Sequence, residues 1–166
     1  TTLFRSGQIF RWQAIEERWT AWEVCDPELL AVAAVDSFHQ WFGVDDLQQY
    51  RCVEPAYFLP PAADVTTWTY VCATGDRTEE TSAAVVGVET QEIGGQSVET
   101  LHVHLATTLS GDSTGGSSID SWFSIDELLL VKEVSSTASS SSSVIGSVDY
   151  TETYEITLET LQPLTP

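Results

Sequence analysis

Two adjacent glycines, Gly94 and Gly95, separate two long segments in which polar and apolar residues alternate. Glycine adopts the positive φ angles that a tight two-residue β-turn requires, and alternation places successive side chains on opposite faces of a strand. These features predict a β-hairpin formed by residues 78–93 and 96–109. The apolar face of the second strand carries Leu101, Val103, Leu105 and Leu109. The opposite face, which we expect to meet solvent or a cleft, carries Thr100, His102, His104, Ala106 and Thr108.

Short alternating runs rich in Thr, Val, Tyr and Trp occur along most of the chain and predict further strands. We expect these near 8–12, 19–25, 45–53, 65–74, 117–125, 127–136 and 147–161. A proline-marked connection, 54–61, interrupts them, and the later connections are short, which favours antiparallel neighbours. A sheet of this size tends to curl or split. The sequence therefore predicts a mainly β fold, an antiparallel sheet curving into a half barrel or open barrel.

One helix is expected over residues 27–42, packed on this sheet. Asp26 is a candidate N-cap, Pro27 suits the first helical position, and Gly43 can close the far end. Between these residues, apolar side chains recur at helical spacing: Ala31, Ala34, Val35, Phe38 and Phe42. Residues 1–18 are expected to be an entry strand or a short helix.

The composition describes a single acidic domain over residues 1–166. Its 25 acidic residues outnumber 6 basic ones, for a formal net charge of −19. That charge makes nucleic acid and an anionic membrane surface poor partners. Apolar residues make up 42% of the chain, enough to bury a core. Two segments of low complexity, 110–118 and 135–143, are rich in serine or glycine and are expected to be flexible loops.

The chain has three cysteines, Cys25, Cys52 and Cys72, which fit no paired metal-binding motif. If helix 27–42 crosses back over the sheet, the strands that end at Cys25 and Cys52 are parallel neighbours, and these two cysteines form the expected disulfide. If the connection 54–61 crosses back over the sheet instead, Cys52 and Cys72 become the better pair. We expect a disulfide, and with it an oxidising compartment outside the cytoplasm. The mature chain would be secreted, or anchored by a segment absent from this sequence.

Two sets of residues are candidates for a binding site. His102 and His104 project from the same face of one strand and could hold a metal ion with an acidic third ligand; the alternative is a pair of solvent-facing histidines. Aromatic side chains on the sheet could line a ligand groove or belong to the core. The candidates for such a groove are Phe38, Trp41, Trp68 and Trp122. In the strand 147–161, Glu152 interrupts the apolar face, as an edge residue or as a buried acid with a partner.

The segment Trp122–Glu133 is similar to a hairpin of LolA-like lipoprotein carriers: a strand begins at a tryptophan, an acidic turn follows, and a second strand ends near Lys132. The stretch from Cys52 through Trp68 and Cys72 to the strand around Tyr154 resembles uncharacterised domains of exported actinobacterial proteins. The carriers are curved antiparallel sheets that hold an apolar group on their concave face, which helices plug. The resemblance implies the same fold here, with 27–42 as the plug.

The function expected from the sequence is that of a non-enzymatic binding or structural domain of the cell envelope, outside the cytoplasm. One alternative is a carrier of an apolar ligand or a lipoprotein in an aromatic-lined concave face. The other is a metal-dependent enzyme built around His102 and His104. No cofactor is expected, and the expected partner is an apolar small molecule or another envelope protein.

Overall fold

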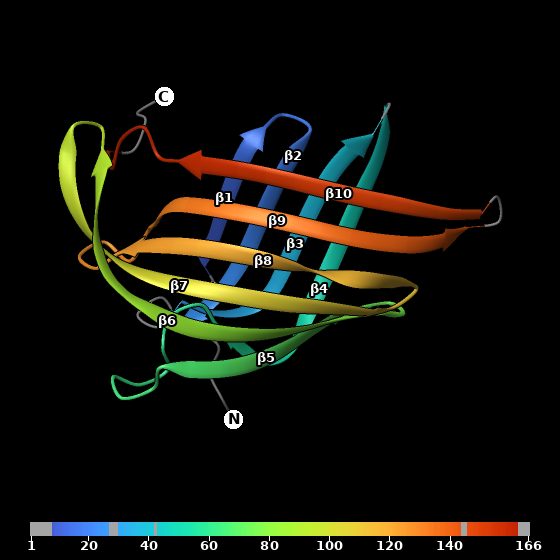
Figure 1. Cartoon of the computed structure of the whole chain (residues 1–166), viewed down its shortest axis with the longest axis horizontal. Helices are drawn as coiled ribbons and strands as arrows, with labels where there is room; N and C mark the ends of the chain where they lie inside the picture. The colour runs from blue at the N-terminus through green and yellow to red at the C-terminus, as the bar shows by residue number, and fades with distance from the viewer. Residues whose placement is uncertain (1–7, 27–29, 42, 144–145, 163–166) are drawn as a thin grey trace.

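The computed structural model describes residues 8–26, 30–41, 43–143 and 146–162. In this part of the chain ten strands form one sheet, and each strand pairs antiparallel with the next in sequence (Figure 1). The strands are β1 (Gln8–Ile15), β2 (Arg18–Asp26), β3 (Ala31–Trp41), β4 (Val44–Tyr57), β5 (Thr67–Thr74), β6 (Arg77–Ile93), β7 (Gln96–Gly111), β8 (Ser113–Ser124), β9 (Leu130–Ser143) and β10 (Gly146–Thr157). The predicted mainly β fold, an antiparallel sheet curving into a half barrel, is confirmed.

The sheet folds over itself at β4. This strand pairs with β3 along most of its length, but with β5 at Arg51–Ala73 and Cys52–Cys72 alone. As a result β1–β4 lie behind the later strands and cross them at a steep angle (Figure 1). The two halves of the sheet therefore face each other, and side chains from both line one interior space. We call the face of each strand that points into this space the inner face.

The predicted helix over 27–42 is wrong. Residues Ala31–Trp41 form β3, which is hydrogen-bonded to β2 on one side and β4 on the other. The apolar spacing that fits a helix also fits a strand with a bulge between Val32 and Ala34, and two neighbouring strands satisfy the backbone of β3 on both sides. Gly43 has a φ of +81° and lies in the turn from β3 to β4. Residues 27–29 and 42 are outside the described part of the chain.

The hairpin of β6 and β7 forms as predicted. Gly94 and Gly95 have φ angles of 58° and 78°, and Ile93 pairs with Gln96 across the turn. Val103 is fully buried on the inner face. The opposite face is only partly exposed to solvent, because Thr100 and His102 are also buried there. An outer cluster of apolar residues covers this end of the hairpin, namely Ile93, Val98, Trp122 and Val131.

The segments 110–118 and 135–143, expected to be flexible loops, lie mainly in strands. β7 extends to Gly111, β8 begins at Ser113, and β9 runs through the serine-rich segment to Ser143. The glycines of 110–118 permit this pairing by letting neighbouring backbones approach closely. A Cβ atom on Gly116 would lie 2.3 Å from the carbonyl oxygen of Thr107. Hydrogen bonds to β8 and β10 thus order a segment whose composition alone is typical of a loop.

Apolar residues on the inner faces form two further clusters. The first surrounds Val103 and Phe123, and the second surrounds Val32 and Tyr50. The connection from β4 to β5 adds Leu59 to the first cluster and packs Phe58 against both. Among the described residues, no helix has the length and apolar character needed to cross a membrane.

Candidate functional site

A cavity of about 680 Å³ lies inside the half barrel, and every strand from β2 to β10 contributes to its wall. This volume is within the range of small-molecule binding sites, roughly 300–1,000 Å³. In most of these strands the wall residues follow the two-residue period. In β3 they are Val35, Ser37 and His39, and in β10 they include Tyr150, Glu152 and Tyr154.

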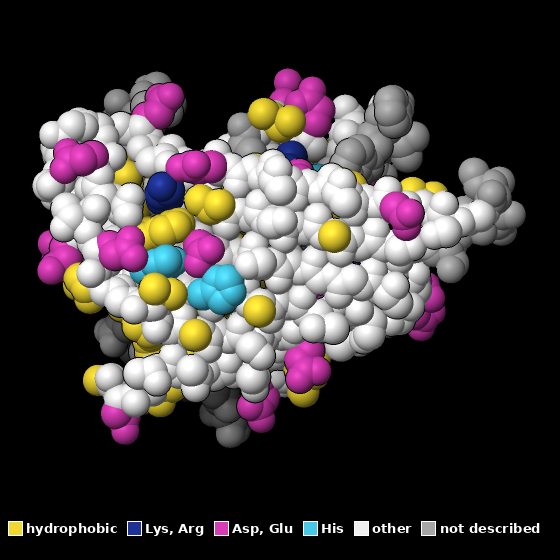
Figure 2. Space-filling model, viewed as in Figure 1, with side chains coloured by type: hydrophobic (Ala, Val, Ile, Leu, Met, Phe, Trp, Pro, Cys, Tyr) yellow, Lys and Arg dark blue, Asp and Glu magenta, His cyan; other side chains and the backbone are white. Residues whose placement is uncertain are grey.

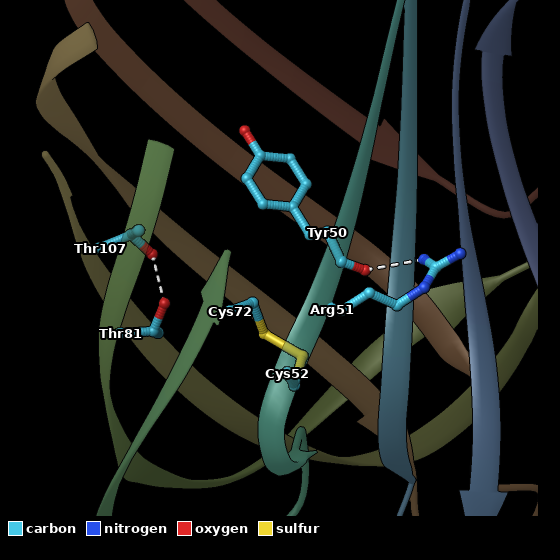
Figure 3. Close-up of a disulfide and its surroundings, with 6 residues drawn as sticks. All are labelled: Tyr50, Arg51, Cys52, Cys72, Thr81 and Thr107. Atoms are coloured by element: carbon cyan, nitrogen blue, oxygen red, sulfur yellow. Dashed lines mark hydrogen bonds between the residues drawn. A yellow bond between two sulfur atoms is a disulfide. The ribbon is translucent and has the colours of Figure 1, made fainter. Parts of the chain in front are cut away.

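The serine-rich segment of β9 forms part of the cavity wall. Alternate residues of β9 face the interior and supply hydroxyl groups, namely Ser135, Thr137, Ser139 and Ser141. From other strands, Thr81 and Thr107 also line it, and their hydroxyl oxygens lie 2.8 Å apart (Figure 3). This part of the wall is therefore polar but carries no charge.

The cavity becomes apolar towards one end. A smaller pocket of about 190 Å³, with almost entirely apolar lining, shares Trp22, Phe58, Phe123 and Leu130 with the large cavity. On β8 and β9 the change is gradual. The pair formed by Phe123 and Leu130 is followed by Ser121 and Glu133, and then by Ile119 and Ser135. The interior thus offers adjoining apolar and polar regions to one ligand.

Glu133 is the most buried acid of the wall, with 8% of its surface exposed. The hydroxyl of Tyr154 donates a hydrogen bond to Glu133 Oε1 at 2.6 Å. Burial raises the pKa of the Glu133 carboxyl, and the hydrogen bond from Tyr154 and the nearby Arg18 guanidinium offset only part of that effect. Arg18 forms an ion pair with Glu152, and its guanidinium lies 4.5 Å from the centre of the Tyr154 ring. Glu152 is therefore a half-buried acid with a basic partner, and it also lies on the edge strand β10, so each of the two alternatives expected from the sequence holds in part.

A second charged group surrounds Arg77 in β6. Arg77 donates to the hydroxyls of Ser113 at 2.6 Å and Tyr50 at 3.4 Å. Burial, followed by the charge of Glu79, raises the pKa of Tyr50 to about 12. Burial likewise raises the pKa of the Glu79 carboxyl, against the opposing effects of Tyr50 and Arg77. Burial thus disfavours the ionised form of two interior acids, Glu79 in β6 and Glu133 in β9. They are far apart in the sequence, but both line the same cavity.

The expected disulfide Cys25–Cys52 is wrong, and the bridge joins Cys52 to Cys72. Because 31–41 is a strand, β3 lies between the strands that carry Cys25 and Cys52. Cys52 and Cys72 are direct partners of β4 and β5, with Cα atoms 3.9 Å apart. The bridge joins these strands beside Tyr50, at the short stretch where they pair (Figure 3). Cys25 is a free thiol that donates to the carbonyl oxygen of Ala31 at 3.2 Å.

Three of the four aromatic residues predicted to bind a ligand, namely Phe38, Trp68 and Trp122, are not brought together. Phe38 lies on the outer face of β3, stacked on Trp19 at 5.4 Å. Trp68 packs against the inner core, and its Nε1 donates to the carbonyl oxygen of Tyr57 at 2.6 Å. Trp122 belongs to the outer cluster. Trp41 is in β3, but its side chain is outside the described part of the structure.

His102 and His104 lie on the outer face of β7, because they alternate with Val103 and Leu105 of the inner core. Figure 2 shows histidine and acidic side chains side by side on the surface of the molecule. His102 Nδ1 is 2.8 Å from Glu89 Oε1, and its Nε2 is 2.9 Å from Asp120 Oδ1. His104 Nδ1 is 2.9 Å from the same oxygen of Asp120. Both ring nitrogens of His102 are therefore engaged by carboxylates. Among the described residues, no three His, Cys, Asp or Glu side chains form a group that could hold a metal ion.

The surroundings of these histidines hold the acids in their ionised form. Hydrogen bonds from Trp122 and then His102 lower the pKa of the Glu89 carboxyl. Burial acts against ionisation of Asp120, but hydrogen bonds from His104 and His102 together outweigh it and lower the Asp120 pKa. The Trp122 ring stacks on His102 at 4.2 Å. The arrangement is a closed hydrogen-bond network of the outer surface.

Comparisons with known proteins give no match: no family model, no curated protein and no solved structure is similar to this chain. The candidate site therefore depends on its own geometry. Sequence reasoning did not identify Arg18, Tyr50, Glu79 or Glu133 as site residues. The sequence does contain a feature that indicates a buried acid at Glu133, because this residue lies between the apolar run Leu128–Val131 and Val134.

Proposed function

We propose that this protein is a non-enzymatic binding domain that holds a small amphipathic molecule inside its half barrel. The observation that carries this proposal is the interior cavity of about 680 Å³, adjoining an apolar pocket of about 190 Å³ through four common wall residues. A cavity with one apolar end and a hydroxyl-rich body suits a ligand with an apolar part and a polar part. A purely structural domain would instead be expected to fill its interior with side chains.

We further propose that the domain works outside the cytoplasm, in or near the cell envelope. The disulfide between Cys52 and Cys72 supports this compartment, because such bridges persist where the environment is oxidising. The metal-dependent enzyme has no comparable support, since carboxylates already occupy both ring nitrogens of His102.

The test is a fluorescence titration with N-phenyl-1-naphthylamine, a neutral apolar probe that brightens in apolar surroundings. We expect saturable binding of one probe per chain. Thr20→Trp adds a large side chain to the cavity wall beside Trp22, where the two cavities meet, and should abolish binding. The control is Ala138→Trp, which adds the same side chain on the exposed outer face of β9 and should bind as the parent does.

Circular dichroism checks that both variants keep the parent fold. If Thr20→Trp does not fold, Ser121→Trp fills the same part of the cavity from β8, beside Phe123. Undiminished binding by a folded, cavity-filled variant would overturn the interior site, and so would the absence of any saturable binding by the parent.

A further inference from the structure

We propose that the ligand is a cationic amphiphile, with an ammonium group beside Glu133 and an apolar body in the pocket at Phe123. This inference depends on the proposed function, because it names the chemical class that the interior cavity selects. It is carried by the charge of the cavity wall, by the partners of Glu133 and by the position of Glu133 relative to the apolar end.

Acidic side chains outnumber basic ones in the wall. The acids that line the cavity are Asp46, Glu79, Glu133, Asp149 and Glu152. The bases are Arg18 and Arg77, together with His39, whose pKa is lowered first by burial and then by Arg18. The interior is therefore favourable for a cation, and the net charge of −19 on the whole chain attracts cations over a longer range.

Both arginines of the wall are already engaged. Arg18 forms the ion pair with Glu152 and lies over the Tyr154 ring, while Arg77 donates to Ser113 and Tyr50. An anionic ligand would have to compete with these partners, and it would also meet the surplus of carboxylates. A fatty acid or a phosphate ester is for this reason a poorer fit than an amine.

Glu133 is the buried acid of the wall that forms no direct ion pair. It lines the cavity, its carboxyl accepts hydrogen bonds from the neutral hydroxyls of Tyr154 and Ser121, and the charge of Arg18 offsets only part of the effect of burial. None of the ion pairs among the described residues includes Glu133. A buried carboxylate is stabilised by a counter-ion, and a ligand cation would supply one from the cavity side.

The tyrosine rings of the wall suit an ammonium group as well. Tyr50, Tyr70, Tyr150 and Tyr154 all line the cavity, and aromatic faces attract alkylammonium ions. The apolar end is close to Glu133. Phe123 pairs with Leu130, and the next inner-facing pair is Ser121 with Glu133. Two residues along a strand span roughly 7 Å, so one molecule can place its head at Glu133 and its apolar body against Phe123.

The test compares three probes that share a twelve-carbon chain and differ in the head group: dodecyltrimethylammonium, dodecan-1-ol and dodecanoate. Each is titrated below its micelle concentration, at pH 8, against the bound naphthylamine probe. We expect dodecyltrimethylammonium to displace the probe at a concentration at least tenfold lower than dodecanoate or dodecan-1-ol. Glu133→Gln should reduce this preference about tenfold, with little change for dodecan-1-ol. The matched control Glu80→Gln, an exposed acid of β6, should keep the parent preference.

The possible failures are distinguishable. Equal or better displacement by dodecanoate or dodecan-1-ol overturns the cationic ligand but leaves the interior binding site standing. Absence of displacement by all three, with the naphthylamine probe bound, also overturns the inference alone. Absence of naphthylamine binding overturns the proposed function. A folded Glu133→Gln variant with the full preference excludes Glu133 as the counter-ion, and the parent series decides the ligand class even if that variant does not fold.

Discussion

At the scale of single residues, a few polar groups are held inside the protein at a cost to its stability. Glu79 and Glu133 line the interior and have carboxyl pKa values that burial raises. Groups whose pKa values are shifted by burial in a cavity cluster at functional sites. Their effect on folding can be measured directly through its dependence on pH.

The first prediction concerns Glu133→Gln. The folded-state pKa of Glu133 lies above its ordinary value of 4.5. Between these two pKa values the native protein binds more protons than the unfolded chain, so the free energy of unfolding falls as the pH rises through that range. Glutamine does not titrate and can still accept the hydrogen bond from Tyr154. The variant should therefore gain stability relative to the parent as pH rises above 4.5, and the two should converge at lower pH. Urea denaturation from pH 4 to pH 8 measures this difference. A constant difference at every pH would contradict the assignment.

The second prediction separates the two faces of β7. Val103 is fully buried and Ala106 is exposed on the opposite face. Val103→Asp places an unpaired carboxylate in the core and should cost several kcal/mol, enough to unfold the domain. Ala106→Asp should change stability by less than about 0.5 kcal/mol. Thermal denaturation of the two variants is the measurement, and equal effects would mean that the register of β7 is wrong.

At the scale of elements, the fold is a meander in which neighbours in sequence are neighbours in the sheet. The third prediction concerns the bridge between β4 and β5, which pair over a short stretch. Cys52→Ala with Cys72→Ala should lower the unfolding free energy by about 3 kcal/mol, because it releases a loop of 20 residues in the unfolded chain. Cys25→Ala is the control and should have a smaller effect. Peptide mapping without reductant should recover a Cys52–Cys72 peptide; a Cys25–Cys52 peptide would contradict this topology.

The fourth prediction concerns the serine-rich part of β9. Residues 135–141 pair with β8 and β10 on both sides, so their amides should exchange with deuterium slowly. Residues 62–64, in the irregular connection from β4 to β5, provide the comparison and should exchange rapidly. Hydrogen-exchange mass spectrometry makes the measurement, and rapid exchange over 135–141 would show a loop instead of a strand.

Elements whose polarity alternates could be predicted from the sequence, and elements that depend on distant partners could not. Gly94 and Gly95 determine a turn locally, and the alternation around Val103 indicates which residues are buried. The apolar spacing of 31–41 fits both a helix and a bulged strand, and pairing with β2 and β4 decides between them. The predicted disulfide depends on the predicted helix over 27–42. Because this segment is a strand instead, the predicted partner of Cys52 is also wrong.

The candidate site was harder to predict than the fold for the same reason. Tryptophan and phenylalanine were expected to line a ligand groove, but Phe38 and Trp122 face outwards. The wall of the cavity is made by a few residues from each of nine strands, Trp22 and Phe123 among them, and the steep crossing of the two halves of the sheet brings them together. A crossing of this kind has no local signature in the sequence.

At the scale of the whole molecule, we propose that the half barrel holds its ligand inside. The alternative surface is the outer face, where Trp19 and Phe38 form a stacked aromatic pair. A crystal structure of the complex with N-phenyl-1-naphthylamine distinguishes the two places directly. We predict density for the probe among Trp22, Phe58 and Phe123, at the boundary of the two cavities. Density for the probe on the outer face, with the interior occupied by solvent alone, would overturn the interior binding site.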